Sequence, residues 1–310
     1  MFDELFSERG LSLDRLRSFL EVAEAGGIAR AAKDDPVRQS QFSRQISDLE
    51  QYFGVSLTER RGKHLGLNAQ GKRLAAVIRE QLHGLHDFRC ECQNAPVRYS
   101  LGAGDSILQW LVVPAMGTWP QQIPDSRLTL TNLRSDQIVE RLLHAQLDFG
   151  IVRAGVVIDP LKQVMIGSLP YALFIPEALA PKARREDLPW LLAHLPWTTL
   201  AAEASFLTRL DDVAAKQGLR FNVILEAESF PQAARAVATG AYAGVLPLAA
   251  APDFTGKKVL VLRPPFLSSV TRKLALVWHP RLLRIRPHAK PAATWLTEKL
   301  SAGLKAVQPQ

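Results

Sequence analysis

Side chains that can read DNA bases lie close together within residues 39–44 of this chain. They are Gln39, Gln41, Ser43 and Arg44. A glutamine amide can pair bidentately with adenine, and an arginine guanidinium can bind guanine or a phosphate. The residue types therefore predict contacts with base edges in a groove of a DNA duplex. Further candidates in the same stretch are Arg38, Ser40 and, one turn further on, Ser47.

A helix is expected to carry these side chains. Phe42, Ile46, Leu49 and Phe53 recur at steps of four, three and four residues, which places them on one apolar face. The candidate base contacts fall on the opposite face, and Gly54 follows the last periodic residue, as is typical of a helix end. The same pattern is also typical of a solvated surface helix, so the neighbouring segments must decide between the two interpretations.

A basic hairpin is predicted directly after this helix, in residues 55–67. Its turn carries Arg60, Arg61 and Lys63, which are suited to phosphates. Residues 38–79 hold eight Lys and Arg against three acids, whereas residues 1–92 as a whole carry no net charge. A polar helix followed by a basic wing is typical of a winged helix-turn-helix module that binds DNA.

Two shorter helices are expected before the polar helix. Apolar residues at helical spacing predict a first helix from residue 13, with Ser12 as its N-cap and a Gly-Gly pair at its end. A short alanine-rich helix follows at 28–33. Residues 34–36 must then form a turn, because Pro36 disfavours a helical conformation at Asp35.

These segments resemble the DNA-binding domain of LysR-type transcriptional regulators, and the spacing from Gly26 to Ile46 matches that family without a gap. The resemblance implies an all-α winged helix-turn-helix with a long linker helix, then a two-subdomain α/β effector domain like a periplasmic binding protein. Arg30, in the second short helix, is a further candidate phosphate contact. Departures from the family pattern occur at Asp35, Ser40, Thr58 and 68–70. The matching residues are Leu13, Phe19, Gly26, Gly27, Arg30, Ala31, Ala32, Gln39, Ser43, Arg44, Gln45, Ile46, Leu49, Glu50, Phe53, Gly54, Val55, Leu57, Glu59, Arg60 and Gly71.

The expected division of the chain follows from these patterns. A DNA-binding domain is expected at 1–67 and a linker and dimerisation helix, whose apolar residues lie near a heptad seam, at 68–94. An effector-binding domain follows at 95–310. Strands and helices alternate in it, which predicts α/β structure with mostly parallel sheets. Subdomain I is placed at about 95–158 and 268–310, and subdomain II at about 159–267.

Open α/β sheets bind ligands beyond the carboxyl ends of their strands. Three loops match the positions that line the effector cleft in the family. An ionised Asp105 in the first loop would repel an effector carboxylate, which favours a cationic or neutral effector unless this side chain points away. The serines can equally serve as ordinary helix N-caps. The candidate effector contacts are Asp105, Ser106, Ser135, Glu203, Ser205 and Ser229.

Composition and motifs exclude several function classes. The 310 residues are 47% hydrophobic and 22% charged, as in ordinary folded proteins, and the net charge of +8 suits a nucleic-acid partner. Cys90 and Cys92 form no metal or redox motif. No catalytic constellation, cofactor fingerprint, export signal or membrane span is recognisable. A cytoplasmic location is expected.

A DNA-binding transcriptional regulator that responds to an unidentified small molecule is therefore predicted, as a homodimer or homotetramer on double-stranded DNA. Two alternatives stay open: a two-lobed solute-binding receptor, and an architectural DNA binder without an effector. The nine Lys and Arg without any acid in residues 257–290 fit subunit contacts, an acidic partner or plain surface charge.

Overall fold

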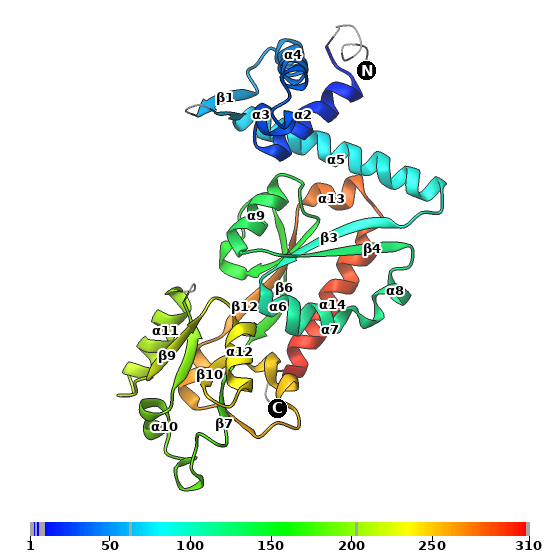
Figure 1. The fold of residues 1–310 in the computed structure, drawn as a ribbon. Coiled ribbons are helices and arrows are strands. Elements are labelled where there is room, and N and C mark those ends of the chain that lie inside the picture. The colour runs from blue at the N-terminus through cyan, green and yellow to red at the C-terminus, as the bar shows by residue number, and fades with distance from the viewer. Residues whose placement is uncertain (1–2, 4, 6–9, 62–63, 202–203, 308–310) are drawn as a thin grey trace.

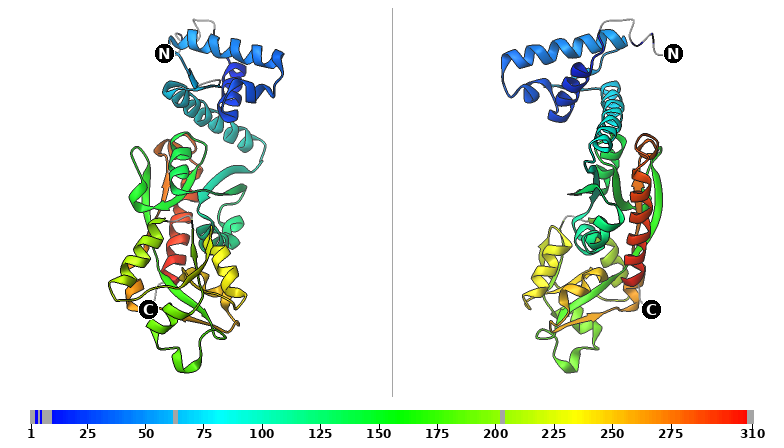
Figure 2. Two further views of the ribbon diagram at one scale, coloured as in Figure 1. Left: turned by 60° about the vertical axis from the view of Figure 1, so that its left-hand side comes forward. Right: turned by 90° about the vertical axis from the view of Figure 1, so that its right-hand side faces the viewer.

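The computed structural model describes residues 3, 5, 10–61, 64–201 and 204–307, and leaves the side chains at 61, 64, 204, 205 and 207 undescribed. Three parts follow one another along the chain (Figure 1). A small helical domain with a two-stranded wing lies at one end, a long helix crosses below it, and two α/β lobes complete the molecule. The same order is visible in the rotated views of Figure 2.

The N-terminal domain contains the elements that its sequence predicts, except that Pro36, expected in a turn, begins the long polar helix. It contains α2 (Leu13–Ala25), α3 (Ile28–Ala32) and α4 (Pro36–Phe53), followed by the antiparallel strands β1 (Thr58–Arg61) and β2 (His64–Leu67). The Ser12 side chain caps α2, and Gly26 and Gly54 end α2 and α4 in the left-handed conformation. The fully buried side chains of Phe19 and Leu49 join α2 to α4 in a common core.

Helix α5 (Ala69–Cys92) begins inside this domain and runs on to the α/β lobes. Its first turns belong to the N-terminal core through Ala75 and Ile78. Gly71 is required for this approach, because a Cβ atom there would lie 2.1 Å from the Leu57 carbonyl oxygen. Further along, Leu85 and Phe88 are 58% and 64% exposed. The second half of α5 therefore presents an apolar surface that this single chain does not cover.

Two five-stranded sheets form the α/β lobes, in the orders β4-β3-β5-β12-β6 and β11-β7-β10-β8-β9. The strands of the first are β3 (Val97–Ala103), β4 (Ser126–Asn132), β5 (Phe149–Arg153), β6 (Lys162–Leu169) and β12 (Arg272–Trp278). Those of the second are β7 (Tyr171–Pro176), β8 (Trp197–Leu200), β9 (Val223–Ala227), β10 (Ala243–Pro247) and β11 (Val259–Leu262).

Helices cover these sheets. In the first lobe they are α6 (Asp105–Ile107), a π-helical turn (Leu108–Val112), α7 (Val113–Ala115), α8 (Trp119–Gln122), α9 (Ser135–Leu143), α13 (Pro280–Ile285) and α14 (Ala289–Val307). In the second lobe they are α10 (Leu188–His194), α11 (Ala204–Ala215) and α12 (Phe230–Ala238). Short 3₁₀ turns lie at Met116–Thr118, Ala154–Val156, Lys182–Arg184, Leu248–Phe254 and Pro265–Ser269.

The sheets differ from the sequence-based expectation in two ways. Each sheet is mixed: β3 pairs in parallel with β4 and β5, but β12 runs antiparallel to both β5 and β6. Strand β6, expected in subdomain II, belongs to the first sheet, so the chain first crosses at Pro170 rather than near 153–159. In the first sheet both differences arise because β12 returns from the second lobe and pairs with β6, which lies about a hundred residues earlier in the chain. The second sheet is mixed because β7 runs antiparallel to β10 and β11 while β8 runs parallel to β10.

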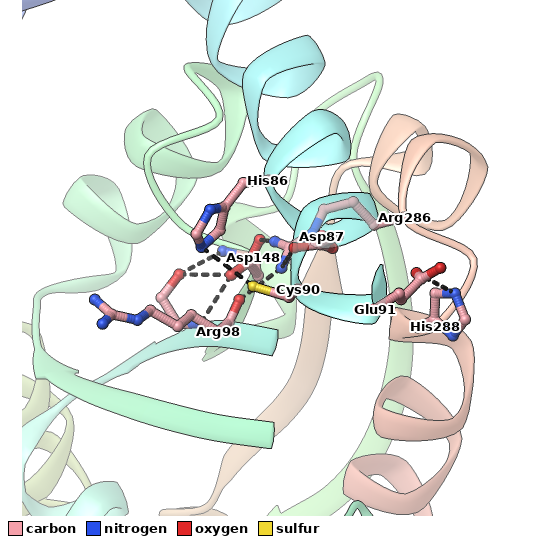
Figure 3. A network of polar contacts seen from close by, with 9 residues as sticks. His86, Asp87, Cys90, Glu91, Arg98, Asp148, Arg286 and His288 are labelled. Carbon is pink, nitrogen blue, oxygen red and sulfur yellow. Dashed lines mark hydrogen bonds and ion pairs between the residues drawn. The ribbon is translucent and has the colours of Figure 1, made fainter. Parts of the chain in front are cut away.

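A buried ion-pair network fixes α5 to the first lobe (Figure 3). Arg286, which follows α13, pairs through Nε with Asp87 Oδ2 at 2.5 Å and through Nη1 with Asp148 Oδ1 at 2.6 Å. Its Nη2 donates to the Arg98 carbonyl oxygen at 2.6 Å, and its Cζ lies 5.0 Å from the centre of the Tyr99 ring. Every nitrogen of this guanidinium is bonded, which offsets the cost of burying it.

Candidate nucleic-acid interface and ligand cavity

The outer face of α4 is solvent-exposed along its length. Gln39, Gln41, Ser43, Arg44 and Ser47 lie on it, and Ser40 between them is exposed as well. On the opposite face Phe42, Ile46 and Leu49 are at most 5% exposed. The helix is therefore held to its domain by one face and leaves the other free to enter a groove. Phe53, expected on the apolar face, is instead 38% exposed, and its ring lies against Tyr52.

Asp35 explains how this helix begins. Its carboxylate accepts hydrogen bonds from the backbone N–H groups of Val37 at 2.8 Å and Arg38 at 3.3 Å. Asp35 is thus the N-cap of α4, with Pro36 at the first helical position, where proline is favoured. The departure from the family pattern at this position supplies a cap.

Arg38 and Arg30 flank the exposed face. Arg38 on α4 lies 3.7 Å from Glu21 and 5.6 Å from the centre of the Phe42 ring. Arg30 on α3 is exposed. Both side chains are long and largely solvated, so each can turn toward a nearby phosphate at little cost.

The wing is oriented by Glu50 on α4, which the sequence identified only as a match to the family pattern. Glu50 Oε1 accepts from Leu57 N at 2.7 Å, Thr58 N at 3.1 Å and Thr58 Oγ1 at 3.0 Å. These bonds fix the chain where β1 begins. Arg60 on β1 is exposed and pairs in register with Leu65. Lys63 and the Arg61 side chain lie outside the described part of the structure.

A cavity of about 1010 Å³ lies between the two lobes. Its walls come from the loops after β3 and β4, the end of β5, the first residues of α9 and α12, and the start of β12. It brings together four of the predicted effector contacts, Asp105, Ser106, Ser135 and Ser229. Glu203 and the Ser205 side chain lie outside the described residues.

The serines of the cavity differ in their roles. Ser229 is the N-cap of α12 and accepts from Gln232 N at 3.4 Å. Ser135 is the first residue of α9, where the Gln137 side chain instead accepts from Arg134 N at 3.1 Å. Ser106, which is 8% exposed, lies one residue after the start of α6. Capping therefore accounts for Ser229 but not for Ser106 or Ser135.

The arginines of the cavity were not predicted from the sequence. Arg134, Arg153 and Arg272 all line it, and the Arg272 Cζ atom lies 5.8 Å from the centre of the Phe230 ring. Arg153 ends β5, so the rule that ligands bind beyond the ends of strands could have identified it. The acids of the lining are Asp105, Asp136, Glu140 and Glu228. The cavity therefore offers charges of both signs.

Both sites, the exposed face of α4 with its wing and the cavity between the lobes, lie in segments that match known protein families. Residues 13–72 match the family model described as bacterial regulatory helix-turn-helix protein, lysR family, and residues 97–301 match that of the LysR substrate binding domain. The chain belongs to the LysR family. It is thus a DNA-binding transcription regulator with an effector-binding domain rather than an enzyme, and the helix-turn-helix match contains α4 and the wing.

Individual relatives of this LysR-type chain agree with the assignment. A probable nitrogen assimilation transcriptional activator of Synechococcus elongatus is 27% identical over 89% of this chain and 92% of its own length. A full-length OxyR variant of Pseudomonas aeruginosa has a TM-score of 0.65 at 19% identity, covering 94% of this chain and 95% of its own. LysG of Corynebacterium glutamicum with bound effector Arg gives 0.62 at 16%, covering 96% and 99%. These two solved structures show the shared fold.

Other site types find no support in the described part of the chain. No group of His, Cys, Asp and Glu among those residues could hold a metal ion. No described helix is long and apolar enough to cross a bilayer. His83 and His86, one turn apart on α5, are both exposed, and His86 Nε2 lies 3.6 Å from Cys90 Sγ.

Proposed function

We propose that this LysR-type regulator reads its operator with the exposed face of α4 and holds the flanking phosphates with its wing. Gln39, Gln41, Ser43 and Arg44 are the base-reading residues, and Arg30, Arg38 and Arg60 bind the backbone. Arg61 and Lys63 are proposed as further phosphate contacts from their positions in the sequence. One observation supports this most: α4 buries Phe42, Ile46 and Leu49 and leaves the amide, hydroxyl and guanidinium groups of the four base-reading residues in solvent.

Footprinting with the DNA upstream of its own gene tests the proposal. We expect one discrete protected region, consisting of two half-sites about one helical turn or a multiple of it apart. Uniform coating of the fragment would instead favour an architectural DNA binder. No protection at any concentration would favour the solute receptor.

A homodimer is proposed as the unit that binds DNA in the cytoplasm. The exposed Leu85 and Phe88 on α5 would be covered by the same helix of a second copy. Two copies related by a two-fold axis would then present two α4 helices to a near-palindromic site.

We propose further that the effector is a small polar molecule with charges of both signs, as an amino acid has. The four acids of the cavity suit a cationic group, and its three arginines suit a carboxylate. The LysG structure that shares this fold carries the amino acid Arg as its effector.

Thermal-shift screening tests the effector class. We expect amino acids to raise the melting temperature more than dicarboxylic acids or uncharged sugars do. Asp105→Asn should abolish the shift caused by the best amino acid, while Asp125→Asn, at an exposed turn outside the cavity, should leave it intact. Stabilisation by dicarboxylates alone would contradict the assignment.

A further inference from the structure

Helix α9 connects the cavity to the linker helix. It lines the cavity along its length, from Ser135 through Val139 and Glu140 to Leu143. At its other end, the carbonyl oxygen of the C-cap residue His144 accepts a hydrogen bond from Arg79 Nη1 of α5 at 3.0 Å. Figure 1 shows α9 in the part of the first lobe that faces α5 and the DNA-binding domain.

Arg79 also contacts the DNA-binding domain itself. The side chain is only 8% exposed, and its Nε lies 3.7 Å from Oε1 of Glu24 in the last turn of α2. No described residue accepts a hydrogen bond from this Nε. Burial lowers the pKa of Arg79, and Glu24 acts in the opposite direction. One incompletely bonded guanidinium on α5 thus contacts two other parts of the chain, the end of α9 and the last turn of α2.

An ion pair and core packing connect α2 to α4, the base-reading helix. Arg15 on α2 pairs with Asp48 on α4, with Nη2 to Oδ2 at 2.9 Å and Nε to Oδ2 at 3.0 Å. The buried Phe19 and Leu49 pack in the same core. A change in the position of α2 is therefore transmitted to α4 by a tightly packed domain.

A second attachment of α5 to the first lobe, at Arg286, is more completely bonded. At Arg286 every nitrogen of the guanidinium has a partner, and two carboxylates hold it. Asp87, its partner on α5, lies eight residues beyond Arg79, about 12 Å along the helix. The fully bonded Arg286 fixes one point of α5. Nearer the DNA-binding domain, α5 meets the first lobe through Arg79 and through the neighbouring Glu80, whose Oε2 lies 3.4 Å from Arg281 Nη1.

We infer that Arg79 is the positioning residue that couples the effector cavity to the DNA-binding domain. An effector that shifts the first turns of α9 moves the His144 carbonyl, which changes how Arg79 holds Glu24 and α2. This inference rests on the proposed function. Because coupling between two sites is reciprocal, DNA binding must also change the state of α9, and this can be measured without knowing the effector.

Hydrogen–deuterium exchange of the full-length protein, with and without a duplex that contains its footprinted site, measures this coupling. We expect saturating DNA to change the exchange of residues 135–143 at least twofold in the wild type. Arg79→Met should abolish that DNA-induced difference, whereas Arg89→Met, an exposed arginine on the same helix, should preserve it. A purely structural role would alter exchange equally with and without DNA.

A second variant, at the exposed partner of Arg79, tests the same coupling without changing a buried side chain. Glu24, 62% exposed at its side chain, can become Gln without loss of the core, and Glu24→Gln should at least halve the DNA-induced difference in α9. If DNA binds the wild type but residues 135–143 do not respond, or if both variants respond as the wild type does, the inference is overturned. Failure of the wild type to bind any DNA would overturn the proposed function, and this inference with it.

Discussion

Arg44 lies on the outer face of α4, directly after Ser43 and two residues past the buried Phe42. The short spacing means that the backbone beneath Arg44 is fixed by core packing while its guanidinium stays in water. A side chain presented in this way can bind a base edge without first breaking contacts with its own domain.

Arg44→Ala should weaken binding to the footprinted site by about 1–3 kcal/mol, and should weaken binding to unrelated DNA much less. Gel-shift titration against both duplexes measures the two effects. Arg235→Ala, an exposed arginine on α12, is the matched control and should leave both affinities unchanged. Equal losses on both duplexes would make Arg44 a phosphate contact instead.

His279 gives a prediction about pH. Its Nδ1 accepts from Arg281 N at 3.2 Å and so caps α13, and the residue is 8% exposed. Burial lowers the pKa of His279 below the ordinary 6.5, and the nearby Arg281 and Arg284 lower it further. The unfolded chain therefore takes up the proton more readily, so this contribution to stability is complete above about pH 6.5 and is lost as the pH falls toward the lowered pKa.

His279→Asn should keep the cap and remove the titration, because asparagine is a good N-cap without a proton to gain. We expect the loss of stability between neutral pH and about pH 5.5 to be smaller in this variant than in the wild type. Urea unfolding at the two pH values measures it. If the pH dependence is unaltered, the loss of stability at low pH is caused by other groups. His144 is one candidate, because burial also lowers its pKa.

At the scale of the element, the polar helix depends on how it starts. Asp35 caps α4 through two backbone N–H groups, so Asp35→Ala should destabilise the N-terminal domain by about 1 kcal/mol. Asp35→Asn retains the acceptor oxygen and should cost only a small part of this. Urea unfolding followed by circular dichroism compares the two variants, and equal losses would show that the charge rather than the cap stabilises the helix.

The N-terminal elements could be predicted because their signals are local. Ser12, Gly26, Pro36 and Gly54 each lie within one turn of the helix end that they define. Sheet membership depends on distant pairing. Residues 164–176 form one apolar run broken by Pro170, and only pairing with β12 shows that its first half belongs to the other sheet. Arg153 and Arg272 both line the cavity because their strands, β5 and β12, pair with each other. These strands lie far apart in the chain, so the sequence could not show that the two arginines share one site.

At the scale of the whole molecule, the apolar surface of α5 is incompatible with an isolated chain at high concentration. Leu85 and Phe88 would gain free energy by leaving water, so the melting temperature should rise with protein concentration. Calorimetry over about a hundredfold range of concentration measures this dependence.

Phe88→Asp should remove the concentration dependence and yield a monomer on gel filtration. Arg89→Asp, a charge reversal at an adjacent exposed position, is the control and should leave the oligomer in place. A wild type that melts at one temperature throughout the range, and elutes as a monomer, would remove α5 as the subunit contact.

The two connections between the lobes have a mechanical consequence. Strands β6 and β12 are neighbours in the first sheet, and the strands on either side of the crossings, β7 and β11, are neighbours in the second. Two covalent segments that run side by side permit bending about the line that joins them but resist twisting of one lobe against the other. We therefore expect any opening of the lobes to follow this one axis, and the size of the cavity to vary with the angle between them.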